Sequence, residues 1–588
     1  MTIKPLSTIY SVLLVVLIII SVYYINLSAE ILSVDDNRLF TWLLNLDNWS
    51  IRGLFAGGGS GYYYRPLITL SFIADNYLWG QSQSFMHLEN ILLHACNAAL
   101  IYFIASEVAR KSGVTSSAAP FAAALLFGLN PLATEPVNWI SGRTDLLAGI
   151  FLFAGMLILV KGLNRHSTVL LSFAVCSLFT AILAKETALF WYPAGMYFVY
   201  CFQGQQDGRP AERPEIHRLT PYALITIIPI AYFVLRHLAF SKGDGGIDLA
   251  AKGIVAGDYD FWNKIRVILK VFGFYIRKLF FPFPLNFGIL SVSNWYVPVG
   301  IVVIVICLCL FYRRTLLGSL LIMSCCLIVP ALLVPLGRMA WTPVAERYLY
   351  MPAAFFTVAV VVFIFRQVRI YAVSPKTVGY IMVLFVGASA LATFQRNLTW
   401  HTNRALFADT VEKSPSFSVA KNELARALAL NGQQSESKKI FLANTLPAED
   451  KFSVIPTVER AKILASENKI EAGIKLLTGM HYTQSQPMYD EYVKALISLY
   501  GMLEQRKKNP LEKRSLHLKR IALTKEYQAI TGDPFLYYQI GKLYLGLKNN
   551  NDAAHFFHLA SVNAPVDAFY KAPAEKLARR LGNGADEQ

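Results

Sequence analysis

Two adjacent carboxylates, Asp35 and Asp36, follow the first apolar segment of the chain in the stretch SVDDNRLF (33–40). A carboxylate can act as a general base and take the proton from an attacking group. Two neighbouring carboxylates can also share a metal ion or raise each other's pKa, although one pair alone does not specify a metal. The alternative is a solvated turn after a membrane helix, and the side of the membrane that the pair faces decides between these hypotheses.

A second set of polar side chains lies within an apolar segment. At 100° per residue they fall within about 80° of one helical face, and they are His87, Asn90, His94 and Asn97. Polar groups inside a membrane span are costly unless they pair with one another or line a cavity. This face therefore either bonds to neighbouring helices or contacts a substrate. No carboxylate-rich partner is evident, so we do not predict a metal site there.

The elements that position these residues are membrane helices. Of the 588 residues, 55% are hydrophobic and only 16% are charged, whereas a soluble protein carries about 25% charged residues. Long uncharged segments end near Phe394, and the chain is polar from about Arg396. We therefore predict a membrane domain (1–395) followed by a soluble domain (396–588). The net charge of +17 arises mainly from short loops between apolar segments, so it indicates membrane orientation and no nucleic-acid partner.

The apolar segments predict about eleven membrane spans, each near the ~20 residues that cross a bilayer. After a first span between Lys4 and Glu30, they are roughly 87–106, 115–134, 146–161, 167–184, 187–203, 219–239, 296–312, 315–335, 347–365 and 377–394. A cleaved signal peptide is the alternative for the first segment. With the N-terminus in the cytoplasm, the basic loops face inward as the positive-inside rule requires. Asp35, Asp36 and the C-terminal domain then face out.

One apolar segment, 261–281, does not fit a span. It contains five basic residues, Lys264, Arg266, Lys270, Arg277 and Lys278, and a single basic residue at a span centre costs at least about 2.5 kcal/mol. Its apolar side chains fall within about 120° of one helical face and the cations fall on the other. This pattern predicts a helix that lies in the membrane interface.

The polar tail carries a repeat pattern. Eight positions have the order and spacing of a tetratricopeptide repeat, namely Tyr537, Ile540, Gly541, Tyr544, Ala553, Phe557, Ala560 and Pro565. Weaker copies begin after Pro415 and near 461–477. Each helix pair must stack on its neighbours to bury its apolar face. We therefore predict an all-α fold, a polytopic membrane bundle followed by an α-solenoid of three or four imperfect repeats that bind a partner.

Several motifs in combination resemble one family. They are the outward Asp35-Asp36 pair, YYYRPLITLSFIADNYLWG (62–80), HLENILLHACNAALIY (87–102), LNPLATEPVNWISGRTDLLAG (129–149), LAKE (183–186), AERYLYMPAA (345–354) and the segment 396–432 that leads into the repeats. This combination resembles the transmembrane and tetratricopeptide-repeat-containing proteins, O-mannosyltransferase-like members of the GT-C glycosyltransferase superfamily. The chain departs from them at Leu129-Asn130-Pro131, where relatives often have His-Pro.

The resemblance implies a catalytic carboxylate in the first outer loop and a sugar donor carried on a polyprenyl phosphate. Asp36 would then be the base, with Asp35 as the alternative or as an orienting residue. Cations must hold the departing phosphate, and the outward candidates are Arg347, Lys278, Arg277, Arg143 and Lys185. These cations could instead reach lipid headgroups. Arg347 could also form a salt bridge with the adjacent Glu346, and Arg143, Glu135 and Asp145 could brace their loop. The candidate pocket residues are Glu135, Asp145, His87, His94, Arg65 and Glu186.

We therefore expect a membrane glycosyltransferase that moves a sugar, mannose in the resembling family, from a polyprenyl phosphate to an extracytoplasmic acceptor. Serine or threonine of a polypeptide presented by the repeats is the first candidate acceptor. The alternatives are a glycan or lipid acceptor, or a non-catalytic membrane scaffold whose repeats bind proteins. The sequence indicates no certain cofactor, with a divalent metal left open. Compact loops favour a bacterial inner membrane with a periplasmic tail, and the endoplasmic-reticulum membrane is the alternative.

Overall fold

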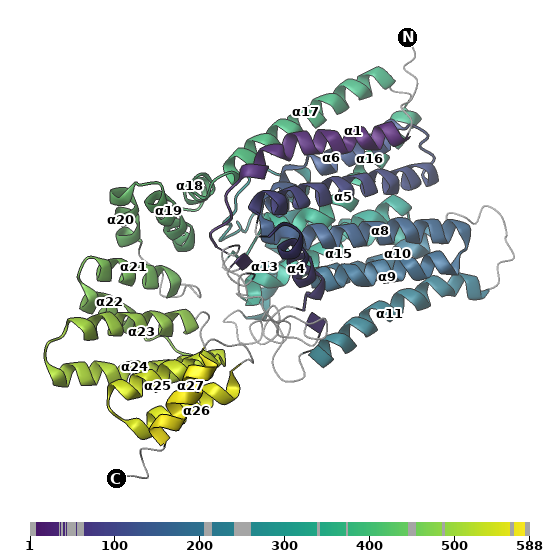
Figure 1. The fold of residues 1–588 in the computed structure, drawn as a ribbon. Helices are drawn as coiled ribbons and strands as arrows, with labels where there is room; N and C mark the ends of the chain where they lie inside the picture. The colour runs from purple at the N-terminus through teal and green to yellow at the C-terminus, as the bar shows by residue number, and fades with distance from the viewer. Residues whose placement is uncertain are drawn as a thin grey trace. The chain divides into compact units, whose positions relative to one another are not determined.

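The computed structural model describes residues 8–34, 36, 39–40, 43, 54–55, 64–80, 82–204, 215–239, 260–337, 342–371, 374–444, 454–484, 489–564 and 570–582 (Figure 1). In these residues the regular structure is helical, apart from an isolated antiparallel bridge between Ile289 and Val344. The predicted all-α fold is therefore confirmed. The chain divides into two compact units, Met1–Pro415 and Ser416–Gln588. The predicted domain boundary at 395 falls inside a helix of the first unit.

The first unit is a bundle of helices, many of which run side by side in Figure 1. Its long helices are α1 (Thr8–Tyr23), α4 (Pro66–Trp79), α5 (Gln83–Lys111), α6 (Ala118–Gly128), α8 (Arg143–Arg165), α9 (Thr168–Ala184), α10 (Trp191–Gly204), α11 (Glu215–Ala239), α13 (Phe261–Phe280), α14 (Tyr296–Arg313), α15 (Leu316–Gly337), α16 (Tyr350–Ile370), α17 (Pro375–Trp400) and α18 (Asn403–Lys413). Short helices join them, namely η1 (Tyr24–Ser28), η2 (Pro131–Ala133), α7 (Thr134–Asn138), η3 (Ile140–Gly142), η4 (Glu186–Phe190) and η5 (Glu346–Leu349).

Eight described segments are long and apolar enough to cross a membrane, and the protein is an integral membrane protein. They are Thr8–Ser28, Gln83–Lys111, Ile140–Arg165, Leu219–Ala239, Tyr296–Arg313, Leu316–Leu336, Glu346–Ile370 and Thr377–Trp400. The three other predicted spans correspond to α6, α9 and α10, with 11, 17 and 14 residues. Because a bilayer needs about 20 helical residues, these three are short, and eleven crossings stay a prediction.

The segment that we expect to lie in the membrane interface forms the helix α13. At its N-terminus the side chain of Asp260 accepts a hydrogen bond from the backbone N–H of Asn263 at 2.7 Å. It packs against α14 and α15. A Cβ at Gly273 would collide with the backbone of Tyr296, so only glycine allows α13 to lie this close to α14. The buried face of α13 includes Lys278, with 2% of the residue exposed. The expectation that all five cations of this helix lie opposite its buried face is therefore wrong for Lys278.

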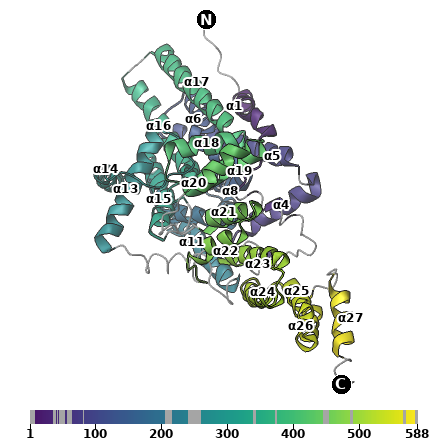
Figure 2. The same cartoon turned by 90° about the vertical axis from the view of Figure 1, so that its left-hand side faces the viewer.

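The second unit consists of consecutive helices, which Figure 2 shows from a second direction. They are α19 (Ser418–Leu430), α20 (Gln434–Ala443), α21 (Val454–Ser466), α22 (Ile470–Thr478), α23 (Tyr489–Arg506), α24 (Pro510–Thr531), α25 (Pro534–Gly546), α26 (Asn550–Asn563) and α27 (Lys571–Gly582). Neighbours pack in pairs, as α25 does on α26. At that pair Gly541 faces the ring of Phe557 without room for a Cβ. These pairs are compatible with the predicted repeats, whose identity stays a prediction.

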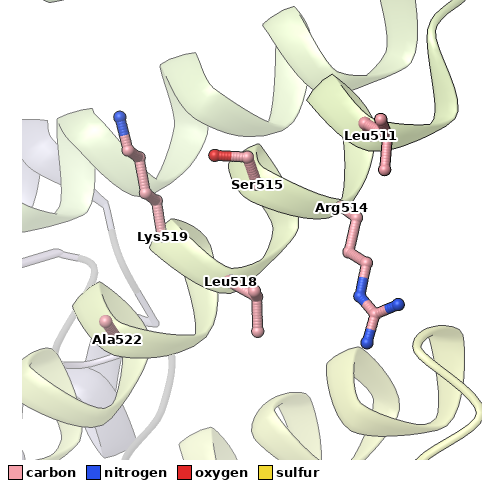
Figure 3. Close-up of a pocket in the computed structure, with 6 residues that line it drawn as sticks. All are labelled: Leu511, Arg514, Ser515, Leu518, Lys519 and Ala522. Carbon is pink, nitrogen blue, oxygen red and sulfur yellow. The ribbon is translucent and has the colours of Figure 1, made fainter.

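One face of α24 is uncovered by other described residues. A shallow groove of about 520 Å³ runs along it (Figure 3), lined by Leu511, Arg514, Ser515, Leu518, Lys519 and Ala522. Leu511 is 78% exposed and Leu518 is 49% exposed. The second unit therefore presents a surface that combines apolar and basic side chains.

Candidate functional site

The candidate site lies at one end of the bundle, where the short helices meet. Helix α7 contacts η2, η3, η5 and the last turns of α17, while η1 contacts α5 and α17. These short helices follow the apolar segments that end in motifs such as LNPLATEPVNWISGR and AERYLY. The topology thus brings together motifs that are more than 200 residues apart in the sequence, such as Glu135 and Arg347.

Asp36 is buried at this end, with only 1% of the residue exposed. Its Oδ1 accepts from the backbone N–H of Ser141 at 3.0 Å and from the Ser141 hydroxyl at 2.5 Å. Its Oδ2 accepts from the backbone N–H of Leu32 at 3.1 Å. Three donors hold the carboxylate in one orientation, which does not fit the alternative of a solvated turn. Asp35 lies outside the described residues.

Arg347 and Glu135 bring two predicted motifs into contact. The guanidinium Nη1 donates to Glu135 Oε1 at 2.6 Å, and the backbone N–H of Arg347 donates to Oε2 at 3.1 Å. The guanidinium also lies over the ring of Trp139, 5.2 Å from its centroid. Arg347 is therefore held by an ion pair and an aromatic face. Its side chain is 12% exposed, and the bond to Glu135 Oε1 uses Nη1 of the guanidinium.

Two further ion pairs lie beside Arg347. Lys185 Nζ donates to both carboxylate oxygens of Asp145 at 2.7 Å. Arg65 grips Glu186 with two bonds of 2.8 and 2.7 Å, and each side chain is about one fifth exposed. Arg65 and Arg347 both act electrostatically on Lys185. The predicted pocket residues Glu135, Asp145, Arg65 and Glu186 therefore belong to one charged cluster.

For both Lys185 and Glu186, the effect of burial on the pKa is opposed by a neighbouring residue of opposite charge. Desolvation lowers the pKa of Lys185, although Asp145 opposes the effect. Burial alone would raise the pKa of Glu186, but Arg65 holds it below the usual value for a glutamate. A carboxylate with a cation beside it stays ionised, because the opposite charge favours the charged form.

Arg143 is fully buried and braces three helices. It forms ion pairs with Asp75 of α4 and, at 3.0 Å, with Glu89 of α5, and its Nε donates to Asn90 at 3.1 Å. Its guanidinium also lies over the ring of Phe72. These contacts favour the structural alternative for Arg143 over a phosphate-binding role. Sequence reasoning missed Asp75 as its partner, although a single acid in the apolar segment 66–79 was a usable signal.

Lys278 also forms its hydrogen bonds with other groups of the protein. Its Nζ donates to Glu346 Oε1 at 2.5 Å, to the carbonyl of Pro282 at 2.8 Å and to the carbonyl of Pro284. Desolvation lowers the Lys278 pKa even though Glu346 opposes it. Arg277, by contrast, stacks on Phe281 and forms no ion pair within the described parts of the chain. Of the two, Arg277 is the more available cation.

On the polar face of α5, His94 and Asn97 form hydrogen bonds to neighbouring helices, whereas His87 differs from them. His94 bonds the Tyr350 hydroxyl and the Gly128 carbonyl, both at 2.9 Å. Asn97 donates to Leu146 O and to Tyr350. His87 is 1% exposed, and its ring lies close to the backbone of Ala29, although neither ring nitrogen meets hydrogen-bond geometry with a described residue. His94 therefore follows the helix-bonding alternative, and His87 stays a pocket candidate.

Within the described residues, no three histidine, cysteine, aspartate or glutamate side chains are grouped closely enough to hold a metal ion. The optional metal of the sequence-based prediction therefore has no ligand set in this part of the chain.

The fold and the site define an integral membrane protein with a buried carboxylate and a cluster of paired charges at one end of a helical bundle. Its sequence is similar to protein O-mannosyl-transferases of the TMTC type. It is 31% identical over 156 residues to human protein O-mannosyl-transferase TMTC1, which covers 24% of this chain and 17% of that protein. The human TMTC2 protein is 31% identical over 150 residues, 24% of this chain and 17% of that protein.

A longer similarity extends to the mouse protein O-mannosyl-transferase TMTC4, 24% identical over 432 residues, 64% of this chain and 57% of that protein. The matched segments thus span less than two thirds of the length of these relatives. No family model matches the chain. The predicted resemblance to the transmembrane and tetratricopeptide-repeat-containing proteins is confirmed, while membership of the GT-C superfamily stays a prediction.

Proposed function

We propose that the protein is a membrane glycosyltransferase that transfers mannose from a polyprenyl-phosphate donor to serine or threonine of an extracytoplasmic polypeptide. The single observation that carries the proposal is the buried carboxylate of Asp36, held on both oxygens at the end of a membrane bundle that also collects Arg347, Lys185 and Arg65. The similarity to named protein O-mannosyl-transferases supports the sugar and the acceptor class.

In the proposed reaction Asp36 takes the proton of the acceptor hydroxyl as its oxygen attacks the anomeric carbon of the sugar. The bond between that carbon and the phosphate oxygen breaks, and its electron pair leaves with the polyprenyl phosphate. A general base of this kind contributes about 10²–10⁴-fold to a rate. A membrane location suits the donor, because its lipid tail stays in the bilayer.

The departing phosphate gains negative charge, so a nearby cation lowers the barrier. Arg347 is the preferred partner, because a guanidinium has five donors and Glu135 engages only one of its terminal nitrogens. Arg277 is the second candidate, while Arg143 and Lys278 serve the fold. Lys185 would act through Asp145 and the charge of the cluster.

The second unit would present the polypeptide acceptor on its helix pairs, with the basic and apolar groove of α24 as one available surface. The proposed orientation places the Asp36 end and the second unit outside the cytoplasm, in a bacterial periplasm first and in the lumen of the endoplasmic reticulum as the alternative. A glycan acceptor would keep the same chemistry with a different second substrate.

The proposal is tested by supplying membranes that contain the full chain with radiolabelled mannose, either as polyprenyl-phosphate mannose or as GDP-mannose. We expect label in protein, released by β-elimination, from the lipid-linked donor alone. Label confined to glycolipid would move the acceptor to the glycan or lipid alternative. Complete absence of transfer, with partner proteins retained on the second unit, would favour the scaffold alternative.

A further inference from the structure

The residues before Asp36 are hydrogen-bonded to Asn403, about 370 residues later in the sequence. Asn403, the first residue of α18, donates from its backbone N–H to Glu30 Oε2 at 2.8 Å. Its side-chain Nδ2 donates to the same oxygen at 3.0 Å and to the Ile31 carbonyl at 2.8 Å. Its Oδ1 accepts from the backbone N–H of Ser33 at 3.0 Å. One asparagine therefore binds three of four consecutive residues of the first loop.

The remaining residue of that four, Leu32, is the one that holds Asp36. The Leu32 N–H donates to Asp36 Oδ2 at 3.1 Å, and the Asp36 N–H donates back to the Leu32 carbonyl at 3.2 Å. Asn403 thus fixes the residues on both sides of Leu32, and Leu32 fixes one oxygen of the carboxylate. Ser141 fixes the other oxygen. The orientation of Asp36 depends on both supports.

Two contacts next to Asn403 strengthen the same connection. The Glu30 N–H donates to the His401 carbonyl at 3.0 Å, and the Ser28 hydroxyl bonds the His401 ring at 3.2 Å. At its other end, α18 is followed by Ser414, whose hydroxyl donates to the Gly288 carbonyl at 2.6 Å and accepts from Asn286 at 2.9 Å. The backbone of Asn286 in turn donates to Glu346, the partner of Lys278. The segment 400–414 therefore joins the Asp36 loop to the Lys278–Glu346 pair.

We propose that Asn403 is a positioning residue that aims the Asp36 carboxylate, which makes the segment 400–414 part of the catalytic unit. This inference rests on the proposed transferase function, because it assigns Asn403 a role through Asp36. Asparagine suits the position since one side chain must donate to the Glu30 carboxylate and the Ile31 carbonyl and accept from the Ser33 amide. Aspartate would keep the acceptor, lose both side-chain donors and place a second carboxylate against Glu30.

The test uses the full chain purified in detergent or nanodiscs, with the variants Asn403→Asp, Glu30→Gln and the two combined. In Asn403→Asp, kcat is expected to fall about tenfold to 100-fold, because a small misplacement of a catalytic group costs that much, while the KM for the donor stays unchanged. An unfolding midpoint that stays above the assay temperature excludes global unfolding as the cause. Adding Glu30→Gln removes the repulsion between two carboxylates and supplies an amide donor to the new carboxylate, but the Ile31 carbonyl still lacks its donor, so the double variant is expected to recover part of the lost kcat. Asn164→Asp is the matched control, because Asn164 near the C-terminal end of α8 also donates to a glutamate, Glu107 at 3.3 Å, and lies outside the segment 400–414 and the first loop.

A second readout separates this inference from the proposed function. Hydrogen exchange of the peptide spanning 28–36 is expected to speed up in Asn403→Asp, to return toward the wild-type rate in the double variant and to stay at that rate in Asn164→Asp. Unchanged exchange in Asn403→Asp, or faster exchange with unchanged kcat, would overturn the positioning role. If the wild-type chain transfers no sugar from any donor, the proposed function fails, and Asn403 then has no catalytic base to position. The exchange rates then still decide whether Asn403 holds the loop.

Discussion

Arg347 and Glu135, separated by 212 residues in the sequence, meet through two bonds that use both carboxylate oxygens. One bond comes from the guanidinium Nη1 and the other from the backbone N–H of Arg347, so both the side chain and the backbone of the arginine are fixed in place. This relationship joins the AERYLY motif to the LNPLATEPVNW motif at the end of the bundle. It gives the proposed site a cation whose position does not depend on the substrate.

The guanidinium donors other than the one bonded to Glu135 lead to the first prediction. Arg347→Lys keeps the charge but loses the planar array of donors that suits phosphate. We expect a loss of about tenfold to 100-fold in kcat/KM for the lipid-linked donor, measured at subsaturating donor. Arg110→Lys is the control, because Arg110 forms an exposed i,i+3 pair with Glu107 at the opposite end of α5. Equal activity of Arg347→Lys and wild type would remove Arg347 from the site.

A second prediction concerns the buried pair of Lys278 and Glu346. Lys278→Met leaves the Glu346 carboxylate buried without its counter-charge, which costs about 3–5 kcal/mol. We expect a large drop in the unfolding midpoint of the detergent-solubilised chain and substantial recovery when Glu346→Gln is added. Lys413→Met should change the midpoint little, since Asp409 keeps Arg396 as its partner. A small effect of Lys278→Met would show that this pair does not hold α13 in place.

Acid sensitivity of the second unit provides a third prediction. Burial alone would raise the pKa of Glu504, but His517 and Arg520 hold it below the usual value for a glutamate. A carboxyl group with a depressed folded-state pKa stabilises the fold above the unfolded-state pKa, and this stability is lost as the pH falls through the folded-state value. The protection factors of the amides in α23 and α24, which compare observed exchange with the intrinsic rate at the same pH, should therefore fall as the pH drops below about pH 5.

The variant Glu504→Gln removes that titrating group, so its protection factors in α23 and α24 should fall less over the same pH range. Glu575→Gln is the control, because Glu575 forms a largely exposed pair with Arg579 that contributes little to stability. Identical pH profiles for Glu504→Gln and wild type would contradict the assignment.

A fourth prediction tests the close packing of α25 on α26. A Cβ at Gly541 would lie 2.8 Å from the Phe557 ring, and overpacking of this kind costs about 1–3 kcal/mol. Gly541→Leu should therefore lower the stability of the second unit, measured by protease sensitivity of the full chain. At Gly582 a Cβ meets nothing within 4 Å, so Gly582→Ala should leave the cleavage rate unchanged. Equal resistance of Gly541→Leu and wild type would contradict this packing.

The sequence allowed much of the architecture to be predicted, because membrane helices depend on local composition. Of the eleven spans that the apolar segments predicted, eight correspond to described helices of spanning length. Asp36, which the sequence singled out as an outward-facing candidate base, is buried and held by hydrogen bonds. The polar face of α5 was also recognised, and within it His94 and Asn97 bond neighbouring helices, while neither ring nitrogen of His87 meets hydrogen-bond geometry with a described residue.

The pairing of charges was not predictable from the sequence. Asp75 lies 68 residues from Arg143, and Lys278 lies 68 residues from Glu346, and nothing local to either residue identifies its partner. Helical periodicity placed Lys278 on the solvated face of α13, whereas a buried carboxylate and two carbonyls draw it to the protein side. The contact of Asn403 with the first loop joins residues more than 370 positions apart, so it could be identified only from the folded structure.

The central claim is that Asp36 is the base in a sugar transfer from a lipid phosphate. Asp36→Asn preserves the acceptor oxygen that Ser141 holds and removes the negative charge, so insertion and folding should persist. We predict that the rate of mannose transfer from polyprenyl-phosphate mannose falls by about 100-fold or more in Asp36→Asn while donor binding persists. Transfer by Asp36→Asn at the wild-type rate would contradict the account.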